Sequence, residues 1–342
     1  MKLLSLVLAT CFVASAATNV EVVIYGGTDA GITAAIQTAR MGHKVALVAP
    51  EAHLGGIVVN GLGHADINNH WFRNDYAVGG VAQEFYRRVG QEYGRTTPVY
   101  RYEPHIAEKV FLDLLKNANI SIYRKERLKE PLSQSIQWSP GTRSIAAITT
   151  ESGAQFAARI FIDATIEGDL LAAAGVQTVV GREANSLYNE TKNGIRAETT
   201  HGQFQVRVDP YKIPGDPTSG LIPTIQDEPL GIPGAADRNI QAYCFRLCLT
   251  RNPENRIAIT KPESFDRSQY EIYLRYLRAG GKFQPPSITL PNDKTDLNGG
   301  RDLSINLYGM NREWPEGSYA TRDRIFAEHR RFTQGLLWFL GN

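Results

Sequence analysis

The segment that decides the fold is VEVVIYGGTDAG, residues 20–31. Its apolar part has the composition of a strand that is buried on both faces of a parallel sheet. The following residues 29–42, DAGITAAIQTARMG, place apolar side chains at helical spacing and end in a glycine suited to the position after a helix. A second apolar run, HKVALVAP (43–50), completes a strand–helix–strand unit. We therefore predict an α/β fold built on a parallel sheet.

The turn between the first strand and the helix is a candidate phosphate-binding site. In the fingerprint G-x-G-x-x-G, three glycines allow a tight turn, close approach of a diphosphate, and packing of the helix on the strand. This chain has the first and third glycines, while Thr28 replaces the second and offers a hydroxyl donor to a phosphate oxygen. A tight turn without a ligand is the alternative, but the flanking strands and helix favour a dinucleotide and a Rossmann-like domain. The candidate residues here are Gly26, Gly27, Thr28, Asp29, Ala30 and Gly31.

Two acidic positions fit a dinucleotide less well. Asp29 brings negative charge to the helix start, where an anionic phosphate is expected. The acid that usually binds the ribose at the end of the second strand is replaced by Ala49. Glu51 follows two residues later, and it either takes that role or is a solvated carboxylate.

A second glycine-rich segment, HLGGIVVNGLGHAD (53–66), favours a flavin over a nicotinamide. Glycines at these positions allow the backbone to lie against a flat ligand. Three short β segments, near residues 135–138, 144–150 and 155–165, form a predicted meander before the next strand–helix unit, and this insertion is also typical of a flavin-binding fold. We therefore expect FAD as the cofactor.

The rest of the chain suggests two domains. Helices are expected at 79–94 and 104–118, a strand at 120–124, a buried strand at 159–164, and a helix at 167–175 whose first turn holds Glu167 and Asp169. From about residue 181, Pro and Gly become frequent, with helices expected near 263–280 and 321–342. The expected organisation is a signal peptide (1–16), an FAD-binding domain (18–180) with a helical insertion (66–100), and a smaller mixed, substrate-facing domain (181–342).

Composition and charge narrow the classes of partner. Of 342 residues, 37 are Lys or Arg and 35 are Asp or Glu, so the chain offers no electrostatic case for binding nucleic acid or an anionic membrane. We expect a small-molecule substrate, and the sequence leaves the oligomeric state open. The start, MKLLSLVLATCFVASA (1–16), has the pattern of a secretory signal peptide, which predicts a secreted protein; a short membrane anchor is the alternative.

The cysteines predict no disulfide framework. Cleavage of the signal removes Cys11 and leaves Cys244 and Cys248. We expect buried thiols, with a mutual disulfide as the second possibility. No partner ligands cluster near them, so no metal site is expected.

Four stretches together resemble a known family. They are YGGTDAGITAAIQTARMGHKVALVAPEAHLGG (25–56), FIDATIEGDLLAAAGV (161–176), VGREANSLYNETKNG (180–194) and QAYCFRLCLT (241–250). They are similar to the FAD-dependent oxidoreductases whose members often carry the label xanthan lyase-like. The first stretch is shared by many flavoproteins, and the other three are more specific to this group.

The resemblance implies a two-dinucleotide-binding-domain flavoprotein fold with non-covalent FAD. It also implies that the chain is truncated at its C-terminus, because members of the family generally continue further. Beyond the first turn, the residues that the resemblance places at the cofactor are Pro50, His53, Leu54, Gly55 and Gly56 along the adenosine-to-flavin side, and Asp163, Ala164, Thr165, Gly168 and Asp169 in a second turn.

The chemistry expected is hydride transfer from a small organic substrate to the flavin, assisted by a base. The candidates for catalytic groups are His64, Asp66, Glu167 and Arg182, each with a structural role as the alternative; for Arg182 that alternative is an ion pair with Glu183. Two other functions stay open. One is a polysaccharide lyase- or hydrolase-associated protein, and the other is a truncated, non-catalytic nucleotide-binding protein.

Overall fold

The computed structural model describes residues 17–67, 74–196, 202–286, 288–300 and 302–342. The expected signal peptide, residues 1–16, and Cys11 lie outside these ranges. The helices are α1 (Asp29–Arg40), α2 (Gly80–Glu92), α3 (Pro104–Asn117), α4 (Asp169–Ala173), α5 (Asn185–Tyr188), α6 (Glu271–Arg278) and α7 (Tyr319–Gly341). The strands are β1 (Thr18–Asn19), β2 (Val22–Tyr25), β3 (Val45–Ala49), β4 (Ser121–Arg124), β5 (Ile136–Trp138), β6 (Ile145–Thr149), β7 (Gln155–Ala157), β8 (Ile160–Asp163), β9 (Leu247–Thr250), β10 (Ile288–Leu290) and β11 (Lys294–Leu297).

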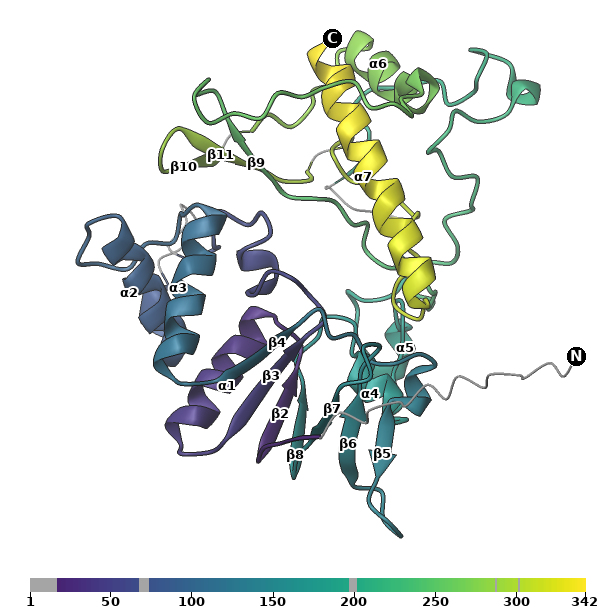
Figure 1. Cartoon of the computed structure of the whole chain (residues 1–342). Helices are drawn as coiled ribbons and strands as arrows, with labels where there is room; N and C mark the ends of the chain where they lie inside the picture. The colour runs from purple at the N-terminus through teal and green to yellow at the C-terminus, as the bar shows by residue number, and fades with distance from the viewer. Residues whose placement is uncertain (1–16, 68–73, 197–201, 287, 301) are drawn as a thin grey trace, which may run out of the picture. The chain divides into compact units, whose positions relative to one another are not determined.

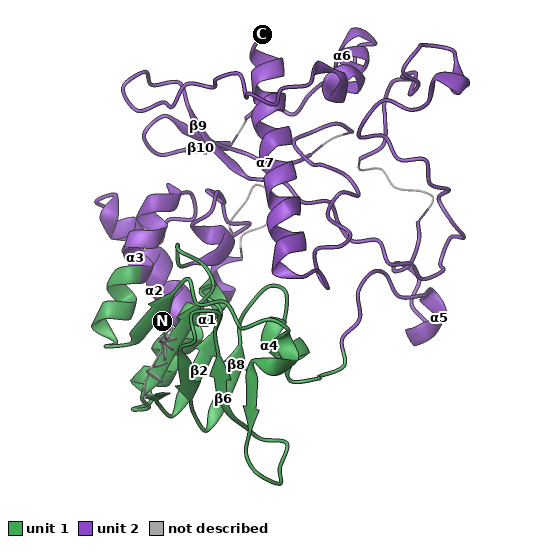
Figure 2. Ribbon diagram, turned by 45° about the vertical axis from the view of Figure 1, so that its right-hand side comes forward, with its two compact units in different colours: residues 1–54, 112–177 green, residues 55–111, 178–342 purple. Residues whose placement is uncertain are grey.

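The chain divides into two compact units, which Figure 2 colours separately. The first contains the residues up to Leu54 together with Leu112–Gln177, and the second contains Gly55–Phe111 together with Thr178–Asn342. The expected insertion, residues 66–100, falls within the second of these units. The domain ranges drawn from the sequence stay a prediction.

The first unit contains the predicted parallel sheet, in the order β4-β3-β2-β8, and this confirms the α/β, Rossmann-like fold class (Figure 1). All four residues of β2 are buried, as the apolar run VVIY predicts. Helix α1 packs on β2 and β3, and buries Ile32 and Ile36. Met41 caps its C-terminus and Gly42 follows with a positive φ of 91°, so the predicted helix end is confirmed.

The expected meander forms a second sheet in the first unit, in the order β1-β7-β6-β5. Its buried side chains Ile148 and Phe156 share one core with Val23 and Tyr25 from the parallel sheet. The Tyr25 hydroxyl accepts a hydrogen bond from the backbone N–H of Leu128 at 2.9 Å, which satisfies a polar group inside this core. The meander therefore covers the face of the parallel sheet from which Val23 and Tyr25 project.

The burial of one predicted strand is wrong. The strand expected at 159–164 forms as β8, in a different sheet from β7, but it is only partly buried. Ile160 is 55% exposed, because β8 forms the edge of the parallel sheet and pairs with β2 alone.

The second unit is built around a core from α6, α7 and the antiparallel sheet β10-β11-β9. The hydroxyl of Tyr270 donates to the carbonyl of Phe332 at 3.0 Å, and that of Tyr273 donates to the carbonyl of Ser304 at 2.7 Å. Leu336 of α7 is fully buried in the same core. The apolar side of α7 therefore packs within this unit.

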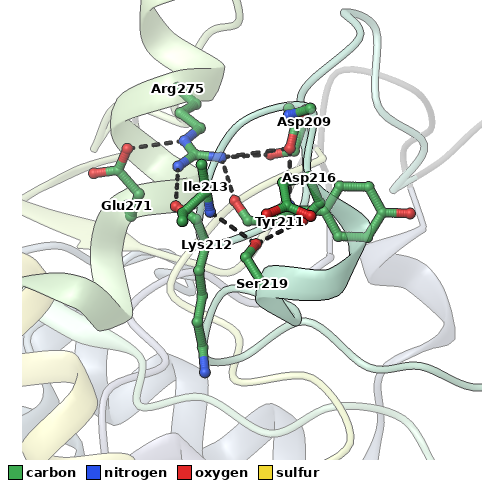
Figure 3. Close-up of polar contacts among 9 residues, drawn as sticks. Asp209, Tyr211, Lys212, Ile213, Asp216, Ser219, Glu271 and Arg275 are labelled. Carbon is green, nitrogen blue, oxygen red and sulfur yellow. Dashed lines mark hydrogen bonds and ion pairs between the residues drawn. The ribbon is translucent and has the colours of Figure 1, made fainter.

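An arginine on α6 organises a long loop of the second unit (Figure 3). The Arg275 guanidinium donates to the carbonyls of Asp209, Tyr211 and Lys212 at 3.1, 2.7 and 3.1 Å, and its Nε donates to Glu271 at 2.8 Å. These bonds satisfy carbonyls that have no partner in a strand or helix, so an irregular loop is held in one conformation.

Candidate functional site

The glycine turn between β2 and α1 is tightly packed against its own chain. A Cβ on Gly31 would lie 2.0 Å from the carbonyl oxygen of Gly26, and a Cβ on Gly26 would lie 2.5 Å from the carbonyl carbon of Ala164. Gly26 also has a φ of 119°, which residues with a side chain rarely adopt. The first and third glycines of the predicted fingerprint are therefore required by sterics.

Thr28 joins the two turns of the first unit. Its hydroxyl donates to the carbonyl of Ala164 at 2.6 Å and accepts from the N–H of Gly31 at 3.1 Å, so it is also the N-cap of α1. The expectation that this hydroxyl donates to a phosphate oxygen is wrong for this arrangement, because Ala164 already receives its proton. Thr28 is 4% exposed and has a structural role.

The start of α1 offers free donors. Gly31 N–H bonds to the Thr28 hydroxyl, and Ile32 N–H bonds to the Thr28 carbonyl. The N–H groups of Asp29 and Ala30 are in the first turn, where a helix has no internal acceptor, and both residues are exposed. These donors, with the positive end of the helix dipole, suit a phosphate; the exposed Asp29 carboxylate opposes it.

Glu51 is fixed beside this turn. Its Oε2 accepts from the N–H of Gly27 at 3.1 Å, so the reading of Glu51 as a merely solvated carboxylate does not describe this geometry. Burial raises the pKa of the Glu51 carboxyl, and the negative charges of Glu167 and Asp169 add to that effect. The carboxylate follows β3, which is where dinucleotide-binding folds place the acid for ribose hydroxyls.

The second predicted turn connects β8 to α4 and is held by its own side chains. Asp163 Oδ1 accepts from the N–H and the hydroxyl of Thr165 at 2.9 and 2.7 Å, and its Oδ2 accepts from the N–H of Leu171 at 2.9 Å. The Thr165 hydroxyl in turn accepts from the N–H groups of Gly168 and Asp169 at 2.9 and 3.2 Å. Asp169 begins α4, whereas Glu167 precedes it, so the prediction of Glu167 in the helix's first turn is wrong.

The two turns meet at one place on the sheet. The Ala164 N–H donates to the carbonyl of Tyr25 at 2.7 Å, and the Ala164 carbonyl accepts the hydrogen bond from the Thr28 hydroxyl. Both turns follow the carboxyl ends of neighbouring strands, β2 and β8. From β2 the chain continues to β3 and β4 on one side, while β8 lies on the other side, so this is the switch point at which open α/β sheets bind ligands.

The segment expected along the adenosine-to-flavin side has mixed roles. Leu54 is fully buried, and a Cβ on Gly27 would lie 2.6 Å from its Cδ2. Gly55 has a φ of 129°, and a Cβ there would lie 2.8 Å from Phe111 Cδ2. Gly56 begins a short 3₁₀ helix, Gly56–Val58; His53 is exposed and Pro50 is half-buried.

The glycines further along this segment contact protein. A Cβ on Gly61 would lie 2.4 Å from the carbonyl oxygen of Arg246, and one on Gly63 would lie 2.3 Å from Leu290 Cδ1. The Gly63 N–H also donates at 3.1 Å to Asp296, which is paired with Arg246 at 2.6 Å. Close packing against β9, β10 and β11 therefore explains these glycines, and the interpretation that they make room for a flat ligand is not needed.

The four catalytic candidates are distributed over both units: Glu167 belongs to the first, and His64, Asp66 and Arg182 belong to the second. His64 is half-buried, and Asp66 is exposed two residues later. Burial lowers the pKa of His64, and the charge of Arg101 lowers it further. His64 is therefore a neutral imidazole near pH 7, with a ring nitrogen able to accept a proton.

Arg182 forms an ion pair with Asp237. Its Nε donates to Asp237 Oδ1 at 2.9 Å and its Nη2 donates to Asp237 Oδ2, and the two residues also form an antiparallel backbone bridge. The Arg182 guanidinium lowers the pKa of Asp237 to about 2. The partner expected from the sequence was the adjacent Glu183; pairing with Asp237, which is remote in sequence, corrects that expectation.

Sequence reasoning missed a buried polar cluster in the second unit. Glu103 is 2% exposed and accepts from Lys294 at 2.5 Å, from Asn292 at 2.7 Å and from the Tyr93 hydroxyl at 3.1 Å. Asn292 and Lys294 are far from Glu103 along the chain, so no spacing pattern marks the cluster. The Glu103 carboxylate is thus occupied by three donors from the protein itself, which indicates a structural role.

The cysteines of the second unit are both free, so the predicted alternative of a disulfide between them is wrong. Cys244 is half-buried and Cys248 on β9 is exposed, which also corrects the expectation of two buried thiols. Within the described ranges, no group of three or more His, Cys, Asp or Glu side chains is arranged to hold a metal ion. No helix in the same ranges is both long and apolar enough to cross a membrane.

A family model described as FAD dependent oxidoreductase matches residues 21–341. Among solved structures, L-proline dehydrogenase from P. horikoshii is similar at 15% identity and a TM-score of 0.36, over 49% of this chain and 59% of that one. L-amino acid deaminase from Proteus vulgaris is similar at 13% identity and a TM-score of 0.36, over 49% and 58% of the two chains. The similarity thus spans less than two thirds of either structure, and no curated protein sequence matches.

Proposed function

Because this chain belongs to the FAD dependent oxidoreductase family, we propose that it binds FAD at the switch point between β2 and β8 and oxidises a small organic substrate. The observation that carries the proposal is the joining of the two turns by the Thr28 hydroxyl, directly beside the free N–H groups of α1. These groups fit the diphosphate of a dinucleotide. When bound, FAD supplies the hydride acceptor.

Each residue of the first turn has a defined task in this proposal. The N–H groups of Asp29 and Ala30 bind the diphosphate, and the glycines allow the backbone to approach it. The Glu51 carboxylate, held on Gly27, binds ribose hydroxyls. The Asp163–Thr165 hydrogen bonds keep the second turn rigid, so less conformational entropy is lost on binding.

A substrate whose oxidation releases a proton needs a proton acceptor. Arg182 does not supply it, because its guanidinium stays protonated and is bonded to Asp237.

The first experiment is flavin reconstitution. Purified protein is mixed with FAD, freed of excess ligand by gel filtration, and examined for flavin absorption and for quenching of flavin fluorescence. Retained FAD supports the proposal, and substrates are then screened by bleaching of the flavin band under anaerobic conditions. A folded protein that retains no FAD would refute the proposal for this chain.

Secretion is a separate proposal, supported by the pattern of residues 1–16. N-terminal sequencing of protein recovered from the medium of a eukaryotic secretory host should begin near residue 17. Protein that stays in the cells with Met1 intact would contradict it. The narrower relationship to members labelled xanthan lyase-like also stays a prediction.

A further inference from the structure

The second unit contains a cavity of about 560 Å³, open to solvent, that has no role in the proposed flavin site. Its size is within the range of pockets for small molecules. The residues that line it are Gly181, Arg182, Glu183, Lys192, Asn193, Gly194 and Arg196. All of them come from one segment of sixteen residues, so the geometry of this cavity depends on how that segment is held.

The segment is held by backbone pairing to residues 231–239. Arg182 N–H donates to the carbonyl of Asp237 at 2.9 Å, and Ile195 N–H donates to the carbonyl of Ala235 at 2.9 Å. At Gly194, a Cβ would lie 2.9 Å from the carbonyl oxygen of Gly234. Both ends of the lining segment are therefore held by backbone hydrogen bonds, and at Gly194 the contact leaves no room for a side chain.

The lining carries more positive than negative charge. Lys192 and Arg196 contribute cations and Glu183 contributes the opposing carboxylate, while the charge of Arg182 is balanced by Asp237. Lys192 and Arg196 are exposed. The Arg196 guanidinium donates to the carbonyl of Lys192 at 3.2 Å, and no carboxylate among the described residues pairs with it. A cavity with this balance attracts anions.

Arg182 offers hydrogen-bond donors in a fixed orientation. Its bonds to Asp237 use Nε and Nη2, and no hydrogen bond of the described residues uses Nη1. The guanidinium is thereby held in place while further N–H donors remain. A guanidinium that is already held in place loses little rotamer entropy when a ligand binds, and its planar N–H donors match the oxygens of an oxyanion.

We propose that this cavity binds a small organic oxyanion, with Lys192 and Arg196 supplying charge and Arg182 supplying oriented donors. Carboxylates and phosphate esters share this chemistry. The proposal does not rest on the flavin site, because every residue involved belongs to the second unit and binding is measured without FAD.

The test is isothermal titration of the FAD-free protein with gluconate, glucose 6-phosphate and uncharged glucose. We expect saturable binding of one or both anions, weakening as salt is added, and no binding of glucose. Which anion binds identifies the oxyanion. Binding of neither anion, or of glucose equally well, would overturn the proposal.

Charge variants make the test specific to this cavity. Lys192→Ala and Arg196→Gln should each weaken anion binding about threefold, as expected for exposed charges, whereas Glu183→Gln should strengthen it by a similar factor. Lys212→Ala is the matched control: its ammonium extends away from the Arg275 cluster (Figure 3), it does not line the cavity, and it should change nothing. Circular dichroism checks that each variant is folded. If the three cavity variants all bind like the unaltered protein, the anion site is elsewhere and the assignment fails.

Discussion

Replacing Thr28 by Val tests the central feature of the first unit, because Val has nearly the same shape as Thr but lacks the hydroxyl. The change removes the N-cap acceptor for Gly31 N–H, which costs about 1 kcal/mol, and the 2.6 Å bond to the Ala164 carbonyl, which costs about 1 kcal/mol more. We therefore expect the free energy of unfolding to fall by about 2 kcal/mol, roughly a thirtyfold change in the folding equilibrium. Thr28 is 4% exposed, so water cannot easily replace the lost partners.

Thr28→Ser is the matched control, since it keeps the hydroxyl and loses only a methyl group worth about 0.8 kcal/mol. Urea denaturation followed by circular dichroism measures both variants without FAD, and flavin fluorescence then measures FAD affinity. We expect the serine variant to retain FAD and the valine variant to bind it more weakly, because the two turns are no longer joined. A valine variant as stable and as well loaded as the serine variant would falsify the structural role given to this hydroxyl.

Three further predictions concern other buried contacts. The pKa of Glu51 is raised above its ordinary value of 4.5, so the stabilising contribution of this carboxyl is present below pH 4.5 and is lost as the pH rises through the folded-state pKa. Glu51→Gln should therefore gain stability relative to the unaltered protein from pH 4 to pH 7, while its FAD affinity falls. A difference in melting temperature between the two proteins that stays constant across that range would contradict this. Gly31→Ala places a Cβ 2.0 Å from the Gly26 carbonyl oxygen, so flavin retention should be lost; retention equal to that of the unaltered protein would show that the turn adapts. Asp296→Asn leaves the half-buried Arg246 without its charge partner and should lower the free energy of unfolding by about 3 kcal/mol in urea denaturation, whereas a loss below about 1 kcal/mol would mean that water solvates the pair.

Local signals in the sequence predicted the parallel sheet well because they act over a few residues. The run VVIY has no polar side chain to solvate, so it forms the fully buried strand β2, and Ile32 and Ile36 lie one helical turn apart on the buried side of α1. The meander was also predicted from its turns. The partial exposure of β8 was not, since it depends on which strands, distant in the chain, lie beside it.

The glycine turn shows the same limit at the scale of single atoms. From the sequence alone, Thr28 is expected to donate its hydroxyl hydrogen bond to a phosphate. Only the structure reveals that this hydroxyl already donates to the carbonyl of Ala164, 136 residues later. Arg182 likewise had an obvious neighbour in Glu183, but the backbone bridge brings Asp237 to it instead. A hydrogen bond forms with whichever partner the fold brings within reach, and sequence distance carries no information about that.

The sequence by itself determined the strand–helix–strand unit and the glycine turn, because these follow from side-chain polarity, helical spacing and the need for residues without a Cβ. Only the tertiary structure decided that Thr28 joins two turns, that Glu51 is held on Gly27, and that Gly61 and Gly63 are small because protein packs against them. The physical reason is that these assignments depend on which atoms from separate parts of the chain compete for the same space and the same hydrogen bonds.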